Sequence, residues 1–160
     1  MLDKINHVKK AMEAGSYQAA LALALTIPDI CGQNEFPNNR VVAKRYTDWC
    51  DKFVNFGDSH IGFGTEAANI DGALLYAIRC AFLHSGNDDI NTQRASNKIS
   101  ITDLKLLKPE QANSFNYQYI VSNNRVETSI NMEYLSNIIC SAAISYYNSL
   151  PNKSNLCNLI

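Results

Sequence analysis

Charge is scarce in this sequence, and neither sign is in excess. Lys and Arg number 14 against 15 Asp and Glu, so charged side chains make up only 18% of the chain and the formal net charge is −1. A protein that binds duplex DNA tightly usually carries clustered basic residues. The composition therefore argues against a broad basic face and predicts no duplex-DNA complex; any contact with nucleic acid is expected to be local and transient.

Paired cysteines and long apolar runs are missing too. The 5 cysteines are odd in number and no two stand at C-x-x-C spacing, which disfavours a disulfide framework and a zinc site. The longest apolar run, AALALALTI, is too short to span a bilayer, and the polar N-terminal segment MLDKINHVKKAMEAG does not have the pattern of a signal peptide. We expect a cytoplasmic protein with no membrane contact, no metal and no cofactor.

Hydrophobic residues are present in the amount that a globular domain needs, at 46% of 160 residues. A chain of this length buries a substantial core and usually forms one domain. We expect that domain to span residues 1–150, with a C-terminal tail over 151–160.

Helical spacing of apolar residues dominates the first half of the chain. Segment 2–13 is the first with this spacing. The run YQAALALALTI predicts a second helix, which Pro28 is expected to end. The segment DICGQNEFPNNR is then predicted to be a loop. A third helix, expected to face the core, carries an apolar stripe of Val42, Tyr46, Trp49, Phe53 and Phe56.

The next helix is expected to follow the glycine-rich loop NFGDSHIGFG. Thr65 and Glu66 resemble the start of a helix that runs to about His84, and Ser85 with Gly86 should stop it, since glycine is the usual residue after a helix. This helix is apolar nearly all round, which favours a place at or near the interface of a two-fold dimer.

The periodicity then switches from helical to alternating. FNYQYIV and RVETSI alternate on either side of the turn residues SNN, which is the pattern of a hairpin. We therefore predict a mainly α protein with a small antiparallel β insert within about residues 99–131. A last helix carries Met132, Leu135, Ile139, Ala142 and Tyr146, and Pro151 should close it.

Arg79 and His84 stand out because the helix around them is otherwise apolar or small. On an α-helix their separation corresponds to about 140° of rotation and about 7.5 Å of rise, so they can flank one groove. A buried arginine needs an acidic partner, a polar cleft or a partner subunit. A histidine can act as general acid or base near neutral pH, and an arginine can hold a phosphate. Together they can promote attack of an RNA 2′-hydroxyl on the neighbouring phosphate.

The run R-C-A-F-L-H resembles the R-x4-6-H motif of the HEPN superfamily. The longer run Y-A-I-R-C-A-F-L-H-S-G resembles a group of small uncharacterised bacterial proteins with the signature Y-x-L-R-C-x-x-L-H-x-G, and IPDICG and RYTDWCDKF upstream fit that group. The resemblance implies a HEPN-like helical bundle that forms a homodimer with a composite cleft at its two-fold axis.

In function, the resemblance implies a metal-independent endoribonuclease, often a toxin of a toxin–antitoxin pair or a phage-defence effector. The catalytic roles fall on Arg79 and His84, and Tyr76, Cys80 and Ser85 are the candidates to contact substrate or support the pair. An RNA substrate and a cognate antitoxin or other protein are the implied partners.

One position departs from the catalytic pattern and keeps a second function open. Many active members of the superfamily have Asn, Asp or His directly after the arginine, whereas this chain has Cys80, whose thiol is a weak hydrogen-bond partner. The alternative is a non-catalytic HEPN-like module that binds a partner protein or a nucleotide. A purely structural interpretation, with Arg79 in an ion pair and His84 at a helix end, also remains open.

Overall fold

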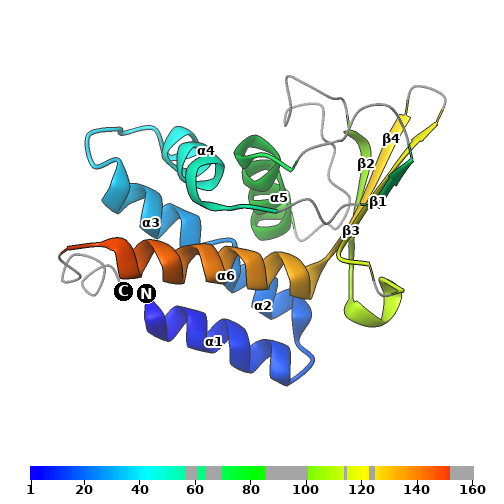
Figure 1. Cartoon of the computed structure of the whole chain (residues 1–160), viewed down its shortest axis with the longest axis horizontal. Helices are drawn as coiled ribbons and strands as arrows, with labels where there is room; N and C mark the ends of the chain where they lie inside the picture. Colours follow the sequence, from blue (N-terminus) through cyan, green and yellow to red (C-terminus); the bar gives the residue numbers. More distant parts are fainter. Residues whose placement is uncertain (57–60, 64–69, 86–100, 114, 123–124, 152–160) are drawn as a thin grey trace.

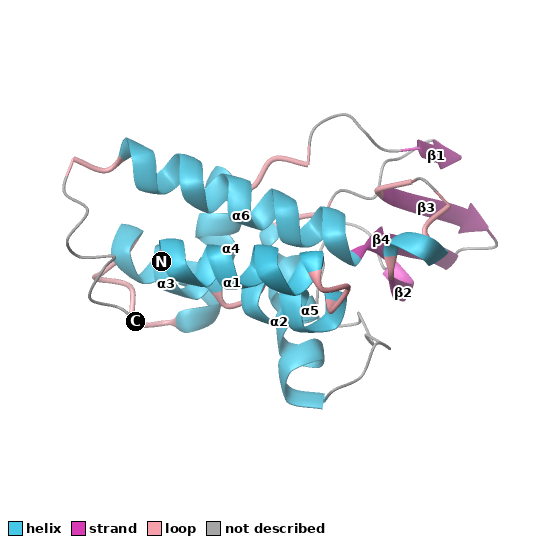
Figure 2. Ribbon diagram, turned by 90° about the horizontal axis from the view of Figure 1, so that it is seen from below, coloured by secondary structure: helices cyan, strands magenta, loops and turns pink. Residues whose placement is uncertain are grey.

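Helices make up most of the residues that the structure describes, and a small sheet lies at one end of them (Figures 1 and 2). The computed structural model describes residues 1–56, 61–63, 70–85, 101–113, 115–122 and 125–151. The helices are α1 (Leu2–Glu13), α2 (Tyr17–Ala24), α3 (Ile27–Glu35), α4 (Val42–Phe53), α5 (Gly72–Ser85) and α6 (Met132–Ser149). The strands are β1 (Ile61–Phe63), β2 (Ile101–Leu107), β3 (Tyr117–Ser122) and β4 (Arg125–Asn131). The predicted mainly α class is confirmed.

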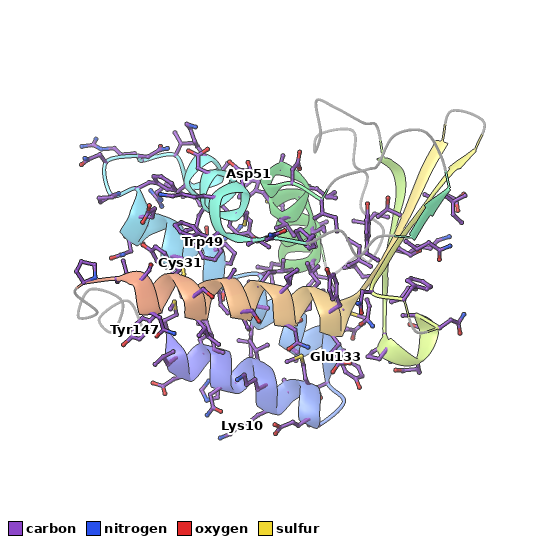
Figure 3. The ribbon with its side chains drawn as sticks, in the orientation of Figure 1. Lys10, Cys31, Trp49, Asp51, Glu133 and Tyr147 are labelled. Carbon is purple, nitrogen blue, oxygen red and sulfur yellow. The ribbon has the colours of Figure 1, made fainter. Side chains whose placement is uncertain are left out.

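The core is built around α6, which packs against α1, α2, α3 and α4. Its buried side chains include Leu135, Ile139 and Tyr146, which recur at helical spacing as predicted. Figure 3 shows Cys31 and Trp49 inside the bundle and Lys10 pointing away from it, in agreement with their burial. In the part of the chain described here, no helix combines the length and apolar character that a membrane crossing requires.

The aromatic stripe of α4 faces the core, as its spacing predicts. Tyr46 and Trp49 are fully buried, and Phe53 is half-buried. The Trp49 ring meets the ring of Tyr146 edge-on, with centroids 5.9 Å apart. The first member of the stripe is an exception, because Val42 lies at the start of α4 and stays exposed. The helix also ends at Phe53, before the last predicted member of the stripe.

Two glycines let α4 approach its neighbours closely. A Cβ at Gly32 of α3 would lie 2.7 Å from the carbonyl oxygen of Arg45, and one at Gly72 of α5 would lie 2.3 Å from the carbonyl oxygen of Thr47. Both distances are shorter than real carbon–oxygen contacts. Only the absence of a side chain allows α3 and α5 to pack against the backbone of α4 in this way.

The prediction that Pro28 ends a helix is wrong. The second helix ends at Ala24, and Pro28 lies in the first turn of α3. The loop predicted to follow Pro28 is also wrong in its first part, because α3 continues to Glu35. Proline fits there because the first turn of a helix leaves its N–H groups unbonded. The break between the helices falls instead at Thr26, whose hydroxyl donates to the carbonyl of Leu23 at 2.7 Å.

The predicted start of the next helix at Thr65 and Glu66 is also wrong. Residues 70 and 71 are not helical, and α5 begins at Gly72. The structure does not describe residues 57–60, 64–69 and 86–100. These ranges include Thr65 and Glu66 themselves, part of the glycine-rich loop and the predicted stop at Gly86. The described part of that loop contains the short strand β1.

The sheet before α6 is confirmed, but it is mixed rather than antiparallel. Its order is β1-β3-β4-β2. The pair β3 and β4 is antiparallel, with Tyr117 opposite Ile130, as the alternating pattern predicts. The pairs β1–β3 and β2–β4 are parallel, which corrects the expectation of an antiparallel insert. The buried side chains of Leu106, Tyr117 and Ile130 occupy neighbouring register positions and line one face.

No loop separates the sheet from α6. Asn131 is the last residue of β4 and also the N-cap of α6, where its side-chain oxygen accepts from the N–H of Glu133 at 2.9 Å and of Tyr134 at 3.4 Å. An asparagine in this position satisfies N–H groups that the first turn leaves open. The helix ends at Ser149, just before Pro151 as predicted; residues 152–160 of the expected tail lie outside the description.

The buried cysteines serve as small apolar side chains. Cys31, Cys50 and Cys140 are buried free thiols, and the thiol of Cys31 donates to the sulfur of Met1 at 3.3 Å. Burial raises the pKa of Cys31 to about 12 and that of Cys140 to about 11. These thiols therefore stay protonated and unreactive as nucleophiles at neutral pH.

Candidate functional site

Helix α5 carries the two residues that the sequence singled out, and its start is fixed by two acids. Asp71 precedes the helix and accepts from the N–H of Leu74 at 2.8 Å. Asp51 of α4 accepts from the N–H of Gly72 at 2.6 Å, and its label in Figure 3 marks where α4 meets α5. Acidic side chains suit this end because the helix dipole is positive there. The helix that holds Arg79 is thus tied to α4.

Arg79 forms an ion pair with Asp29 of α3. The Nε–H of the guanidinium donates to Oδ2 of Asp29 at 2.8 Å, and Nη2 lies 2.5 Å from the same oxygen. Only 18% of the Arg79 side chain and 25% of the Asp29 side chain are exposed. An acidic partner was one of the three environments that the sequence required for this arginine, and the structure supplies it from a residue 50 positions away.

Two tyrosine rings flank the guanidinium. The central carbon of Arg79 lies 5.9 Å from the ring centroid of Tyr46 and 5.7 Å from that of Tyr76. These separations are within the range of cation–π attraction. The two rings also meet each other edge-on, with centroids 5.4 Å apart. Asp29 and the two rings together restrict the position of the guanidinium group.

The pKa values of these groups follow from their surroundings. Burial opposes the charged form of Arg79, but attraction to Asp29 and hydrogen bonds with Asp29 and Cys80 outweigh it, so its pKa is raised. Burial raises the pKa of Tyr46 well above its usual value. Burial also raises the pKa of Tyr76, and repulsion from and hydrogen bonding with Cys80 add to the effect. At neutral pH the guanidinium is charged and both phenols are protonated.

Two polar atoms on residues that contact Arg79 have no hydrogen-bond partner within the described structure. They are Oδ1 of Asp29 and the hydroxyl oxygen of Tyr46, and both are buried. Buried polar atoms are nearly always paired, so each exception requires an explanation. Three other buried side-chain atoms share this property, but they lie on residues that do not contact Arg79 in any interaction found here.

The structure brings three of the sequence-predicted site residues together and does not describe the side chains of the other two. Arg79, Tyr76 and Cys80 lie on α5 and interact with one another. The backbones of His84 and Ser85 belong to the last turn of α5, but their side chains lie outside the described residues. The place of the His84 ring relative to Arg79 therefore stays a prediction from helical spacing.

Sequence reasoning missed Asp29 and the role of Tyr46. Asp29 stood in a segment predicted as a loop, and nothing in its neighbours distinguishes it from the other acids. Tyr46 was correctly predicted as a core residue, but its position beside the arginine was not. The only available signal was the need of Arg79 for a negative partner.

Comparisons with known proteins do not identify a relative. No family model, curated protein or solved structure matches the chain. Within the described residues, no group of three His, Cys, Asp or Glu side chains is arranged to hold a metal ion. The chemistry of the site therefore has to be argued from Arg79 and its neighbours.

Proposed function

We propose that this protein is a HEPN-like endoribonuclease in which Arg79 and His84 act on RNA. The 2′-hydroxyl attacks the adjacent phosphorus atom while the imidazole of His84 accepts its proton. The bond from phosphorus to the 5′-oxygen breaks, and that oxygen takes up a proton from an imidazolium or from water. The products are a 2′,3′-cyclic phosphate and a 5′-hydroxyl end, and the reaction runs without a metal ion.

The state of the Arg79 guanidinium is the observation that supports this proposal. A guanidinium has five N–H donors; Nε donates to Asp29, Nη2 forms the ion pair with the same carboxylate, and Cys80 also hydrogen-bonds the group. The side chain is held in place but is not enclosed, since 18% of it is exposed. A guanidinium that is held in place and partly exposed can stabilise the negative charge that builds up on the phosphate oxygens during attack.

The proposed active unit is a homodimer with α5 at or near its two-fold axis. Within one subunit, Phe82 and Leu83 of α5 remain only half-buried. Apolar side chains near the end of the helix that carries Arg79 would gain from burial against a second copy. Sedimentation at micromolar concentration tests this, and a monomer would count against it.

A second candidate is the non-catalytic module that binds a protein or nucleotide. The favouring observation is that the charge of Asp29 offsets that of Arg79 at close range, which weakens the attraction to a phosphate. The residue next to the arginine is Cys80, whose thiol is a weak hydrogen-bond partner. A module of this kind would bind without cleaving.

Cleavage of RNA in EDTA by the purified protein distinguishes the two candidates. The nuclease should cut RNA, leave cyclic phosphate ends and spare an oligonucleotide of the same sequence that lacks 2′-hydroxyls. His84→Ala should lower the rate by about 100-fold or more, the usual scale of a general acid–base group. Arg79→Lys should also lower it, because an ammonium cannot reproduce the guanidinium fork.

Arg45→Lys is a matched control for the arginine variant. Arg45 is also half-buried, but it lies on α4 and donates to the backbone carbonyl of Asn39 at 2.7 Å. This variant should keep the wild-type rate, and circular dichroism should show that all variants fold. A wild-type protein that binds RNA but leaves every sequence intact would favour the binding module.

A further inference from the structure

The ion pair between Arg79 and Asp29 has an unusual geometry for a pair that only stabilises the fold. A carboxylate often receives an arginine through two parallel bonds, one to each oxygen. Here the Nε hydrogen bond and the Nη2 contact both fall on Oδ2, while Oδ1 is buried with no partner among the described residues. Half of the carboxylate has lost its water without gaining a bond, which costs free energy. The arrangement holds the guanidinium in place but leaves one oxygen of the Asp29 carboxylate without a hydrogen bond among the described residues.

A second buried group beside the same guanidinium is also unsatisfied. Tyr46 is fully buried, its ring lies 5.9 Å from the central carbon of Arg79, and its hydroxyl has no partner in the described part of the chain. Unsatisfied groups gathered around one charged side chain are typical of a site arranged for function rather than stability. The cluster formed by Asp29, Tyr46, Tyr76 and Arg79 has this character.

The other acid of α3 shows what an ordinary pair looks like. Glu35 receives Lys52 of α4 at 2.6 Å, and the lysine side chain is 55% exposed. Neither oxygen of Glu35 is a buried atom without a partner. The two pairs join α3 to a neighbouring helix through acids of similar exposure, at 21% for Glu35 and 25% for Asp29. They differ mainly in the cationic partner: Lys52 is 55% exposed, whereas Arg79 is 18% exposed and lies near two tyrosine rings.

We propose that Asp29 is a positioning residue, which holds Arg79 in the orientation that receives the phosphate of an RNA substrate. This rests on the proposed nuclease function. Asp29 holds the edge of the guanidinium that carries Nε and Nη2, so the N–H groups that point away from Asp29 have fixed directions. The rings of Tyr46 and Tyr76 limit rotation of the guanidinium about those bonds. An aligned guanidinium stabilises the transition state without a reorganisation cost during the reaction.

The charge of Asp29 makes this role separable from a general electrostatic effect. A carboxylate near the site repels RNA phosphates, so Asp29→Asn should leave RNA binding unchanged or tighten it. Loss of alignment should act on the chemical step instead. We expect kcat to fall by about 10- to 100-fold, the scale of a small misplacement of a catalytic group, with KM unchanged or lower.

Glu35→Gln is the matched control, because it removes an acid from an ion pair on the same helix. It should change kcat by less than about 2-fold, the size of a neutral surface substitution. Asp29→Glu keeps the charge but displaces it by one methylene, and its kcat should lie between those of wild type and Asp29→Asn. If Asp29→Asn does not fold, Asp29→Glu decides the test, and a kcat equal to that of wild type would overturn the proposal.

The nuclease function and the role of Asp29 can fail separately. If wild type cleaves RNA and Asp29→Asn matches Glu35→Gln in kcat, the function stands and the positioning role is overturned. If wild type cleaves no RNA, the NMR signal of the Arg79 Nε–H, assigned with Arg79→Lys, is followed during titration with inorganic phosphate. A shift in wild type that is lost in Asp29→Asn supports positioning; no shift in wild type, or the same shift in both proteins, refutes it.

Discussion

Replacing Gly72 with alanine tests the close approach of α4 and α5, on which the position of Arg79 depends. The new Cβ would lie 2.3 Å from the carbonyl oxygen of Thr47, 2.8 Å from its Cα and 2.9 Å from Oδ1 of Asp51. Two of these three atoms are backbone and cannot rotate away. To reach an ordinary contact distance, the start of α5 must withdraw by about 1 Å.

The expected loss of stability combines three contributions. Overpacking of this kind costs about 1–3 kcal/mol. Withdrawal also stretches the 2.6 Å bond from the Gly72 N–H to the Asp51 carboxylate, and a hydrogen bond to a charged group contributes about 1.5–3 kcal/mol. Alanine returns at most about 1 kcal/mol through its higher helix propensity. We expect a net loss of about 2–4 kcal/mol in the free energy of unfolding.

Urea unfolding followed by tryptophan fluorescence measures this loss. Trp49 is the single tryptophan and lies fully buried on α4, beside the perturbed contact. With a slope near 2 kcal/mol per molar urea, the midpoint should fall by about 1–2 M. Gly15→Ala is the comparison: its Cβ would meet no atom within 4 Å, and only its φ of +70° opposes the change. A Gly72→Ala midpoint at or above that of wild type would refute the close approach.

Two further predictions concern the α6 cap and the buried thiols. Asn131→Ala should lower the free energy of unfolding by about 1 kcal/mol through loss of the cap, whereas Asn131→Asp, which keeps the acceptor, should stay within about 0.5 kcal/mol of wild type; equal loss in both variants would show that the cap is not the cause. In the unfolded chain a cysteine thiol has a pKa near 9.0, whereas in the folded chain the pKa is about 11 for Cys140 and about 12 for Cys31. The folded state therefore holds these protons more tightly, and the free energy of unfolding should fall as pH rises from about 9 toward these values. Each thiol adds a slope of up to about 1.4 kcal/mol per pH unit, and urea titrations between pH 8 and 11 should show a smaller slope for Cys140→Ala; an unchanged slope would contradict the burial of that thiol.

Local patterns in the sequence predicted the elements whose burial they encode. The spacing of Tyr46 and Trp49 predicted the buried face of α4, and alternation on either side of SNN predicted the antiparallel hairpin that β3 and β4 form. These features repeat within one element or across one turn, so neighbouring residues reveal them. The fold class followed from the same signals.

Features that depend on distant parts of the chain could not be read in this way. The parallel pairs β1–β3 and β2–β4 join strands with long connections, and no local residue pattern specifies such a partner. Pro28 was misjudged because proline is compatible with both the end of one helix and the first turn of the next. The need of Arg79 for an acid was predictable, but the choice of Asp29 depends on how α3 packs against the rest of the bundle.

Strand β4 continues directly into α6, so the sheet is joined to the helical bundle without an intervening loop. Asn131 pairs with Leu107 of β2, and its N–H donates to the carbonyl of Asn116 at 3.0 Å, while its side chain starts the helix. The same residue therefore belongs to the sheet and also caps the first turn of α6. Because α6 packs against α3, which carries Asp29, one continuous helix connects the sheet to the element that holds the acid of the Arg79 ion pair.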